Sequence, residues 1–234
     1  MKIKRDIKGI LFDLDGTLLD IDLNKFYLIY SRHLYENFPN SMTLGQFTKH
    51  YWASTYKTKN HNTRRKNFEV LMEEFLLPFS LTREEAESIL RNYYKNEYPK
   101  LKNFVNPRPE SREVVQYVIK KNFKAVIATD PVFILEAIKA RMNWAGIDDL
   151  PFDLITHAEN FSICKPDLNY FREVLLKIGL KAEECLVVGD DNNDMVAKLL
   201  GCQTFLIKSP MTFLKEDTPK PDFVGNLKDL IKLL

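Results

Sequence analysis

The sequence predicts an α/β fold with a parallel-sheet, Rossmann-like core that carries helices on both faces. From about Asn106 to the C-terminus, short segments rich in Val, Ile and Phe alternate with amphipathic segments of helix length. The short segments are apolar at nearly every position rather than at every second one, which is typical of parallel strands buried on both faces. Strand–helix alternation of this kind predicts a parallel sheet between two helical layers.

The expected elements of this core follow one another closely along the chain. Strands are expected at 123–130, 152–156, 185–190, 203–207 and 222–225. Helices are expected at 110–122, 131–146, 168–179 and 193–201, and the last three end at a glycine. Asp130 and Pro131 suit an N-cap and a first helical turn, so we take Asp130 mainly as a helix cap.

The chain between residues 22 and 104 differs from this core. It follows one further apolar run at 9–12 (GILF) and shows helical periodicity without a convincing strand. Amphipathic helices are expected at segments that include 26–38, 63–77 and 82–98, the last with the capping-box pair Thr82 and Glu85. We therefore predict a core of residues 1–20 and 105–234, a helical insert of residues 21–104 after the first strand, and a return linker at 106–109 (NPRP).

Composition indicates an ordinary globular protein. The chain has 234 residues, 45% of them hydrophobic and 28% charged, and a net charge of +2 that argues for neither a nucleic acid nor a membrane as partner. Its three cysteines have no CxxC spacing, which favours reduced thiols. No apolar run approaches the ~18 residues of a membrane span, so we expect a cytoplasmic protein. The oligomeric state cannot be derived from the sequence.

Carboxylates follow several of the expected strands, at the edge where open parallel sheets bind their ligands. A cluster of carboxylates cannot stay ionised without a cation, and Mg²⁺ is the hard, oxygen-bound ion that suits it best. The candidate site residues are Asp13, Asp15, Thr129, Asp130, Lys165, Asp190, Asp191 and Asp194.

Four motifs among these residues resemble those of the haloacid dehalogenase-like hydrolase superfamily, and they occur in the same order. They are DLDGT at 13–17, Thr129 after a strand, KPD at 165–167 and GDDNND at 189–194. The resemblance implies phosphoryl transfer through an aspartyl-phosphate, with Mg²⁺ as cofactor and a small phosphorylated metabolite as substrate. It also implies that the helical insert is a cap domain.

The resemblance further assigns roles to single residues. Asp13 would be the nucleophile, and Asp15 would act as general acid and base. Thr129 and Lys165 would hold the phosphoryl oxygens. Mg²⁺ would bind the carboxylate of Asp13, the backbone carbonyl of Asp15 and the carboxylate of Asp190.

The other acids of the motifs are less clearly assigned. Asp194 shares a helical face with Asp190 and would act behind it or through water. Asp191 would likewise lie behind the metal ligands, or it could simply cap a helix. Asp130 is grouped with Thr129 and Lys165 as a substrate-binding candidate. It departs from the asparagine that is common in the family, and it adds negative charge near an anion site.

Other functions stay open at this stage. The chain could be a phosphomutase or a dehalogenase on the same fold, although Asp15 argues against a dehalogenase. It could also be a phosphorylation-switched binding protein, a class that likewise uses clustered aspartates, Thr and Lys. The basic run 57–66 is either a solvated loop or a surface that attracts an anionic substrate.

Overall fold

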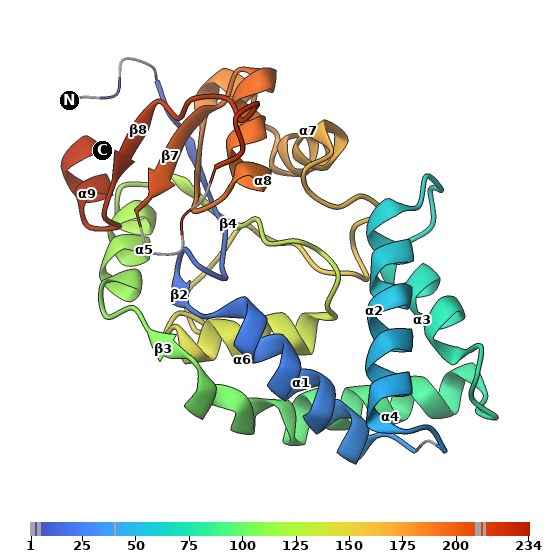
Figure 1. Ribbon diagram of the computed structural model, residues 1–234. Coiled ribbons are helices and arrows are strands. Elements are labelled where there is room, and N and C mark those ends of the chain that lie inside the picture. The colour runs from blue at the N-terminus through green and yellow to red at the C-terminus, as the bar shows by residue number, and fades with distance from the viewer. Residues whose placement is uncertain (1–2, 4–5, 40, 209–211, 213) are drawn as a thin grey trace.

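A six-stranded parallel sheet forms the centre of the molecule (Figure 1). The computed structural model describes residues 3, 6–39, 41–208, 212 and 214–234. The strand order is β5-β4-β1-β6-β7-β8, and each neighbouring pair is parallel. The strands are β1 (Gly9–Phe12), β4 (Lys124–Ile127), β5 (Leu154–Ile155), β6 (Cys185–Gly189), β7 (Gln203–Ile207) and β8 (Phe223–Gly225). The predicted fold class and the predicted strands are confirmed, although most strands are shorter than expected.

Helices cover both faces of this sheet, as the apolar strands require. Ile10 belongs to an apolar cluster that also holds Val114 of α5. Leu11, the next residue of β1, belongs to a second cluster with Val174 of α7, because successive side chains of a strand point to opposite faces. The helices of the core are α5 (Glu110–Lys120), α6 (Leu135–Trp144), α7 (Leu168–Ile178), α8 (Asn192–Met195) and α9 (Asp229–Leu233).

Two predicted helices differ from the structure. The segment after β4 becomes helical only at Leu135, and residue 134 at its N-cap provides no side-chain cap. The prediction that Asp130 caps this helix is therefore wrong, and the carboxylate of Asp130 takes other partners described below. The expected helix at 193–201 is a short α-helix followed by a 3₁₀ turn, η3 (Val196–Leu200), which ends at Gly201 in a left-handed conformation.

Helices also make up most of the chain between β1 and α5. They are α1 (Leu23–Asn37), α2 (Leu44–Asn60), α3 (Asn67–Leu76), α4 (Arg83–Asn96) and the 3₁₀ helix η1 (Tyr98–Phe104). A further short 3₁₀ helix, η2 (Ala182–Glu184), precedes β6. Figure 1 shows α1 to α4 side by side, away from the sheet. The capping box of Thr82 and Glu85 is present at α4. The three expected helices of this segment are confirmed.

Aromatic side chains hold these helices together. The hydroxyl of Tyr30 in α1 is hydrogen-bonded to the hydroxyls of Tyr51 in α2 and Tyr94 in α4. Phe26 of α1 packs edge-on against Tyr98. The same apolar cluster continues to the sheet through Ile10, so the helices and the core share one hydrophobic interior.

The chain leaves the core and returns to it at one place. The strands β2 (Leu19–Asp20) and β3 (Asn106–Pro107) form a two-stranded antiparallel ribbon, with Leu19 opposite Pro107. The predicted return linker thus pairs with the outgoing chain. The division into residues 1–20 with 105–234 and residues 21–104 stays a prediction, and residues 1–2 and 4–5 lie outside the described part. No helix in the described residues is long and apolar enough to cross a bilayer.

Candidate active site

Two neighbouring strands bring together acids that lie far apart in the sequence. β1 and β6 pair with Phe12 opposite Val188, and the backbone N–H of Asp13 donates to the carbonyl of Val188 over 2.9 Å. Carboxylate oxygens of Asp13, Asp190 and Asp194 lie within 4.8 Å of one another. The register of two buried parallel strands therefore places these three carboxylates around one point.

Two glycines allow this close approach. Gly16 has a φ of +86°, and a Cβ at that position would lie 2.3 Å from Oδ2 of Asp190. A Cβ at Gly189 would lie 2.1 Å from Oδ2 of Asp194. The hydroxyl of Thr17 donates to Oδ1 of Asp190 over 3.1 Å, which fixes that carboxylate against the turn after β1.

Lys165 is the cation within the acidic cluster. Its Nζ donates to Oδ1 of Asp13 over 2.8 Å and to Oδ1 of Asp194 over 2.6 Å, and the residue is 4% exposed. Burial opposes its charge, but the two carboxylates hold its pKa well above the usual range. Tyr170 lies under the ammonium and donates to the carbonyl of Thr129 over 2.9 Å, so the loop after β4 is tied to the same site.

The acidic cluster has more negative than positive charge. Burial raises the pKa of Asp13 well above its usual range, with Asp194 and Asp190 adding to the rise and Lys165 opposing it. Burial, together with the charge of Asp191, raises the pKa of Asp190 to about 6. Burial also raises the pKa of Asp194 to about 7 against the effect of Lys165. Buried carboxylates that repel one another are a donor set that fits a hard divalent cation.

Asp15 makes an ion pair that the sequence interpretation missed. Its Oδ2 accepts from Nη1 of Arg141 over 2.5 Å, and Nε of Arg141 donates to the hydroxyl of Tyr98 over 2.7 Å. Arg141 is 1% exposed, and its guanidinium carbon lies 4.1 Å from the centre of the Phe133 ring. Burial raises the pKa of Asp15, and Arg141 opposes the rise. The sequence signal for this ion pair was Arg141 itself, a basic residue on the apolar face of the helix expected at 131–146.

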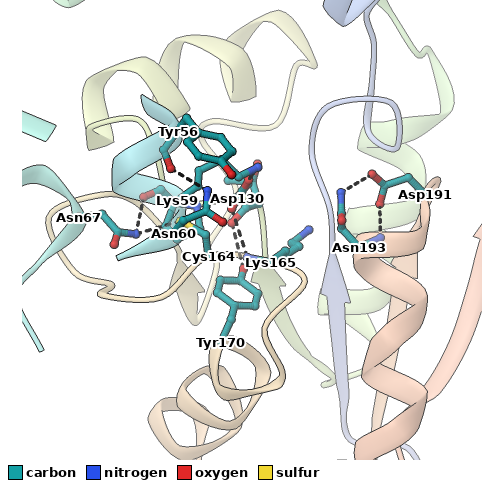
Figure 2. A network of polar contacts seen from close by, with 12 residues as sticks. Tyr56, Lys59, Asn60, Asn67, Asp130, Cys164, Lys165, Tyr170, Asp191 and Asn193 are labelled. Carbon is teal, nitrogen blue, oxygen red and sulfur yellow. Dashed lines mark hydrogen bonds and ion pairs between the residues drawn. The ribbon is translucent and has the colours of Figure 1, made fainter. Parts of the chain in front are cut away.

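Asp130 lies where the helical segment meets the core (Figure 2). Its carboxylate pairs with the ammonium of Lys59 in the last turn of α2, and it accepts from the backbone N–H of Lys165 over 3.3 Å. Burial lowers the pKa of Lys59, but Asp130 outweighs burial and raises it above the usual value. Lys59 of the basic run 57–66 thus pairs with an acid of the site, whereas Lys57 and Arg65 pair with glutamates of α3.

Asp191 is a helix cap. Its Oδ1 accepts from the backbone N–H of Asn193 over 2.8 Å, and its Oδ2 accepts from the Asn193 side chain over 2.6 Å (Figure 2). This geometry satisfies a free N–H group in the first turn of α8. Of the roles considered for Asp191, capping is the one that its contacts show.

A cavity of about 310 Å³ opens beside Asp15 and Arg141. Its walls combine residues of α1 and α2 with residues of the loop after β4. Its lining side chains include Tyr27, Trp52, Lys59, Thr129, Val132 and Phe133. A wider groove of about 900 Å³ runs from Arg64 past Lys165 to Asn193. Asp15, an acid of the turn after β1, therefore faces space that a small molecule can enter.

Comparison with known sequences identifies the family. The sequence model of the haloacid dehalogenase-like hydrolases matches residues 7–197. The chain therefore belongs to the haloacid dehalogenase-like hydrolases and is an enzyme of the hydrolase class. This confirms the resemblance carried by the four motifs.

Individual relatives span nearly the whole chain. The phosphoglycolate phosphatase of Aquifex aeolicus is 29% identical, with 97% of each chain covered. A pyrophosphatase PpaX of Bacillus cereus is 24% identical, with 97% of this chain and 96% of the relative covered.

Solved structures share the fold. A predicted phosphoglycolate phosphatase from Haemophilus somnus aligns with a TM-score of 0.61 at 20% identity, covering 98% of this chain and 99% of the other. The L-2-haloacid dehalogenase of Xanthobacter autotrophicus, solved with chloropropionic acid covalently bound, aligns with a TM-score of 0.61 at 16% identity and 97% coverage of both chains. Identities this low show a common fold.

Proposed function

We propose that this enzyme is a Mg²⁺-dependent phosphatase that hydrolyses a small phosphomonoester through an aspartyl-phosphate on Asp13. The observation that carries the proposal is the group of Asp13, Asp190 and Asp194 around Lys165 at the end of two buried strands. The phosphatase names of full-length relatives support it. The substrate is a small phosphorylated metabolite, and the place of action is the cytoplasm.

The reaction needs two displacements at phosphorus. A carboxylate oxygen of Asp13 attacks the phosphorus, and the bond to the leaving oxygen breaks as Asp15 gives that oxygen a proton. Water then attacks the phosphorus, Asp15 takes its proton, and the bond to Asp13 breaks. Burial raises the pKa of Asp15, which favours a carboxyl group that can carry the proton for the first step.

Lys165 and Thr129 hold the phosphoryl group during both displacements. The ammonium of Lys165 already contacts Asp13, so a phosphoryl group on Asp13 lies within its reach. Asp194 positions Lys165 through the 2.6 Å hydrogen bond to its ammonium. Preorganised donors of this kind stabilise the charge that spreads over the phosphoryl oxygens.

The cation would be held by the carboxylates of Asp13 and Asp190 and by the backbone carbonyl of Asp15. Bound there, it supplies positive charge that offsets the repulsion between the nucleophile and the phosphoryl group. The raised pKa values of Asp13 and Asp190, caused first by burial, support an ion at this point.

Residues 21–104 are proposed as a cap domain over a core of residues 1–20 and 105–234. The cavity beside Asp15 supports this division, because Trp52 and Lys59 come from the helical segment and Thr129 comes from the core. A cap that closes over the site would keep bulk water away from the aspartyl-phosphate.

The proposal is tested by phosphate release from p-nitrophenyl phosphate and from a panel of phosphorylated metabolites, with and without Mg²⁺. Asp13→Asn should lower the rate at least about a thousandfold, since it removes the nucleophile. Asp149→Asn is the matched control, because Asp149 is an exposed acid paired with Arg112. Equal rates for wild type and Asp13→Asn would overturn the proposal. An isomerised ester without free phosphate would make the enzyme a phosphomutase, and chloride release from a chlorinated acid would make it a dehalogenase.

A further inference from the structure

The ion pair of Asp15 and Arg141 carries two atoms without a hydrogen-bond partner. Within the described part of the chain, neither Oδ1 of Asp15 nor Nη2 of Arg141 has one, although both atoms are buried. Buried polar atoms are nearly always satisfied in native proteins, and an unpaired one is costly. Both residues line the cavity of about 310 Å³. The two atoms therefore indicate a ligand that offers complementary groups.

The geometry of the pair determines what such a ligand presents. Oδ2 of Asp15 accepts a hydrogen bond from Nη1 of Arg141, and Nη2 is attached to the same guanidinium carbon as Nη1. The free donor therefore lies beside the carboxylate that serves the leaving oxygen. Arg141 cannot turn away, because Nε is held by Tyr98 and the guanidinium stacks on Phe133. A fixed donor next to the proton carrier suits an acceptor oxygen close to the ester oxygen.

The rest of the cavity indicates the body of the ligand. Tyr27, Trp52, Val132 and Phe133 supply apolar and aromatic wall. The other cation of the wall, Lys59, is already paired with Asp130, as Arg141 is with Asp15, so the described wall has no uncompensated positive charge. Such a wall favours a flat apolar group over a second phosphate.

We infer that Arg141 determines substrate specificity: its Nη2 donates to a carbonyl-type oxygen on the carbon next to the ester carbon of an aromatic leaving group. This inference rests on the proposed function, because it takes Asp15 as the proton carrier for the leaving oxygen. Asp15 and Arg141 together then bind the ester oxygen and its neighbouring acceptor. Arg141 comes from α6 of the core, so this part of specificity does not depend on the helical segment alone.

The first test compares phenacyl phosphate with phenethyl phosphate, which lacks the carbonyl but keeps the aromatic body. Arg141→Met should lower kcat/KM for phenacyl phosphate about tenfold more than for phenethyl phosphate, mainly through KM. The intrinsic reactivities of the two esters cancel in this comparison. Arg91→Met is the matched control, since Arg91 of α4 forms an ion pair with Glu136, which lies in α6 as Arg141 does, but Arg91 is not part of the cavity wall. It should affect both esters equally. Equal losses with Arg141→Met would overturn the inference.

The second test measures binding and needs no turnover. Quenching of tryptophan fluorescence, to which Trp52 in the wall contributes, reports binding of phenacyl alcohol and phenethyl alcohol. Wild type should prefer phenacyl alcohol about tenfold, and Arg141→Met should lose the preference. If Arg141→Met fails to fold, Asp15→Asn/Arg141→Met is compared with Asp15→Asn, because the double variant leaves no buried unpaired charge. Absence of the preference in wild type overturns the inference. A preference without phosphate release from any ester rejects the proposed function and retains only the binding of the carbonyl oxygen by Arg141.

Discussion

The ammonium of Lys59, in the last turn of α2, forms an ion pair with the carboxylate of Asp130, which follows β4. The pair joins the helical segment to the loop that also holds Thr129. Asp130 contacts the backbone N–H of Lys165 as well, so the same carboxylate links three segments of the chain. The family commonly has asparagine at this position, whereas this chain has the aspartate Asp130, which is paired with Lys59.

A double-mutant cycle of Lys59→Met and Asp130→Asn should give a coupling free energy of about 1 kcal/mol at low salt, because both groups are partly screened by water. The coupling should decrease as the salt concentration rises. Urea unfolding of the four proteins measures it. The more exposed pair of Lys57 and Glu74 is the control and should couple less. A coupling of zero at low salt would show that the ion pair does not hold the two segments together.

Gly16→Ala should destabilise the protein and abolish activity. The substitution forces φ of +86° on a residue with a Cβ and drives that Cβ onto the carboxylate of Asp190. Gly146→Ala separates the two effects, since Gly146 has φ of +71° but open space around it. Urea unfolding should show a loss of about 1 kcal/mol for Gly146→Ala and a clearly larger loss for Gly16→Ala. Equal losses would mean that the contact with Asp190 is unimportant.

Mg²⁺ should stabilise the folded protein against heat. A ligand that binds only the folded state at a hundred times its Kd adds about 2.7 kcal/mol, which corresponds to a rise in Tm of roughly 5 to 10 °C. Asp190→Asn should remove most of this rise, because it takes away one of the clustered carboxylates. Asp222→Asn, at an acid paired with Lys198 away from the cluster, should keep it. Calorimetry with and without EDTA gives the result, and an equal rise in both variants would place the ion elsewhere.

Glu159 makes stability depend on pH. The imidazole of His157, with Nδ1 at 3.3 Å from Oε2, and hydrogen bonds from Arg91 and the backbone N–H of Leu135 together lower the pKa of Glu159 from 4.5 to about 2. A lowered folded-state pKa means that the stabilisation is fully present above pH 4.5 and is lost as the pH falls towards 2.

Glu159→Gln should therefore lower the free energy of unfolding by about 1 to 2 kcal/mol at pH 7, after allowance for screening by water. The difference from wild type should stay constant down to about pH 5 and vanish near pH 2. Urea unfolding across this range, with Glu110→Gln at a partly exposed acid as control, measures the difference. A difference that persists at pH 2 would assign the effect to packing instead of charge.

Much of the fold could be predicted because the sequence signals are local. The apolar run 203–207 is a strand over the same residues in the structure. Gly179 ends α7 in a left-handed conformation, and Thr82 with Glu85 begins α4, as their residue types indicate. These elements depend on backbone geometry within a few residues, which the chain encodes directly.

The missed helix α2 has a different kind of buried face. Ser54, Thr55 and Thr58 lie inside, and each hydroxyl donates to the carbonyl four residues before it. Because these hydroxyls form their hydrogen bonds within the helix, polar residues can occupy its buried face, and the helical pattern of apolar residues is weakened. Polar composition therefore concealed an element that packs against α1 and α3.

The proximity of the candidate residues could be predicted where they belong to motifs, and it was missed where it depends on tertiary contact. Asp13 and Asp190 follow strands, so strand order alone brings them together. The pairing of Arg141 with Asp15 depends on how α6 lies against the turn after β1, and no local pattern records that distance. Asp130 was assigned to the wrong partner because Lys59 reaches it from a helix that had not been recognised.

The ribbon of β2 and β3 has an evolutionary consequence. Asp20 and Asn106 lie opposite each other, so the excursion between them begins and ends at nearly the same point in space. A different excursion could be grafted at these ends without moving the sheet. Selection could therefore exchange the helical segment while the strands that precede Asp13 and Asp190 remain untouched.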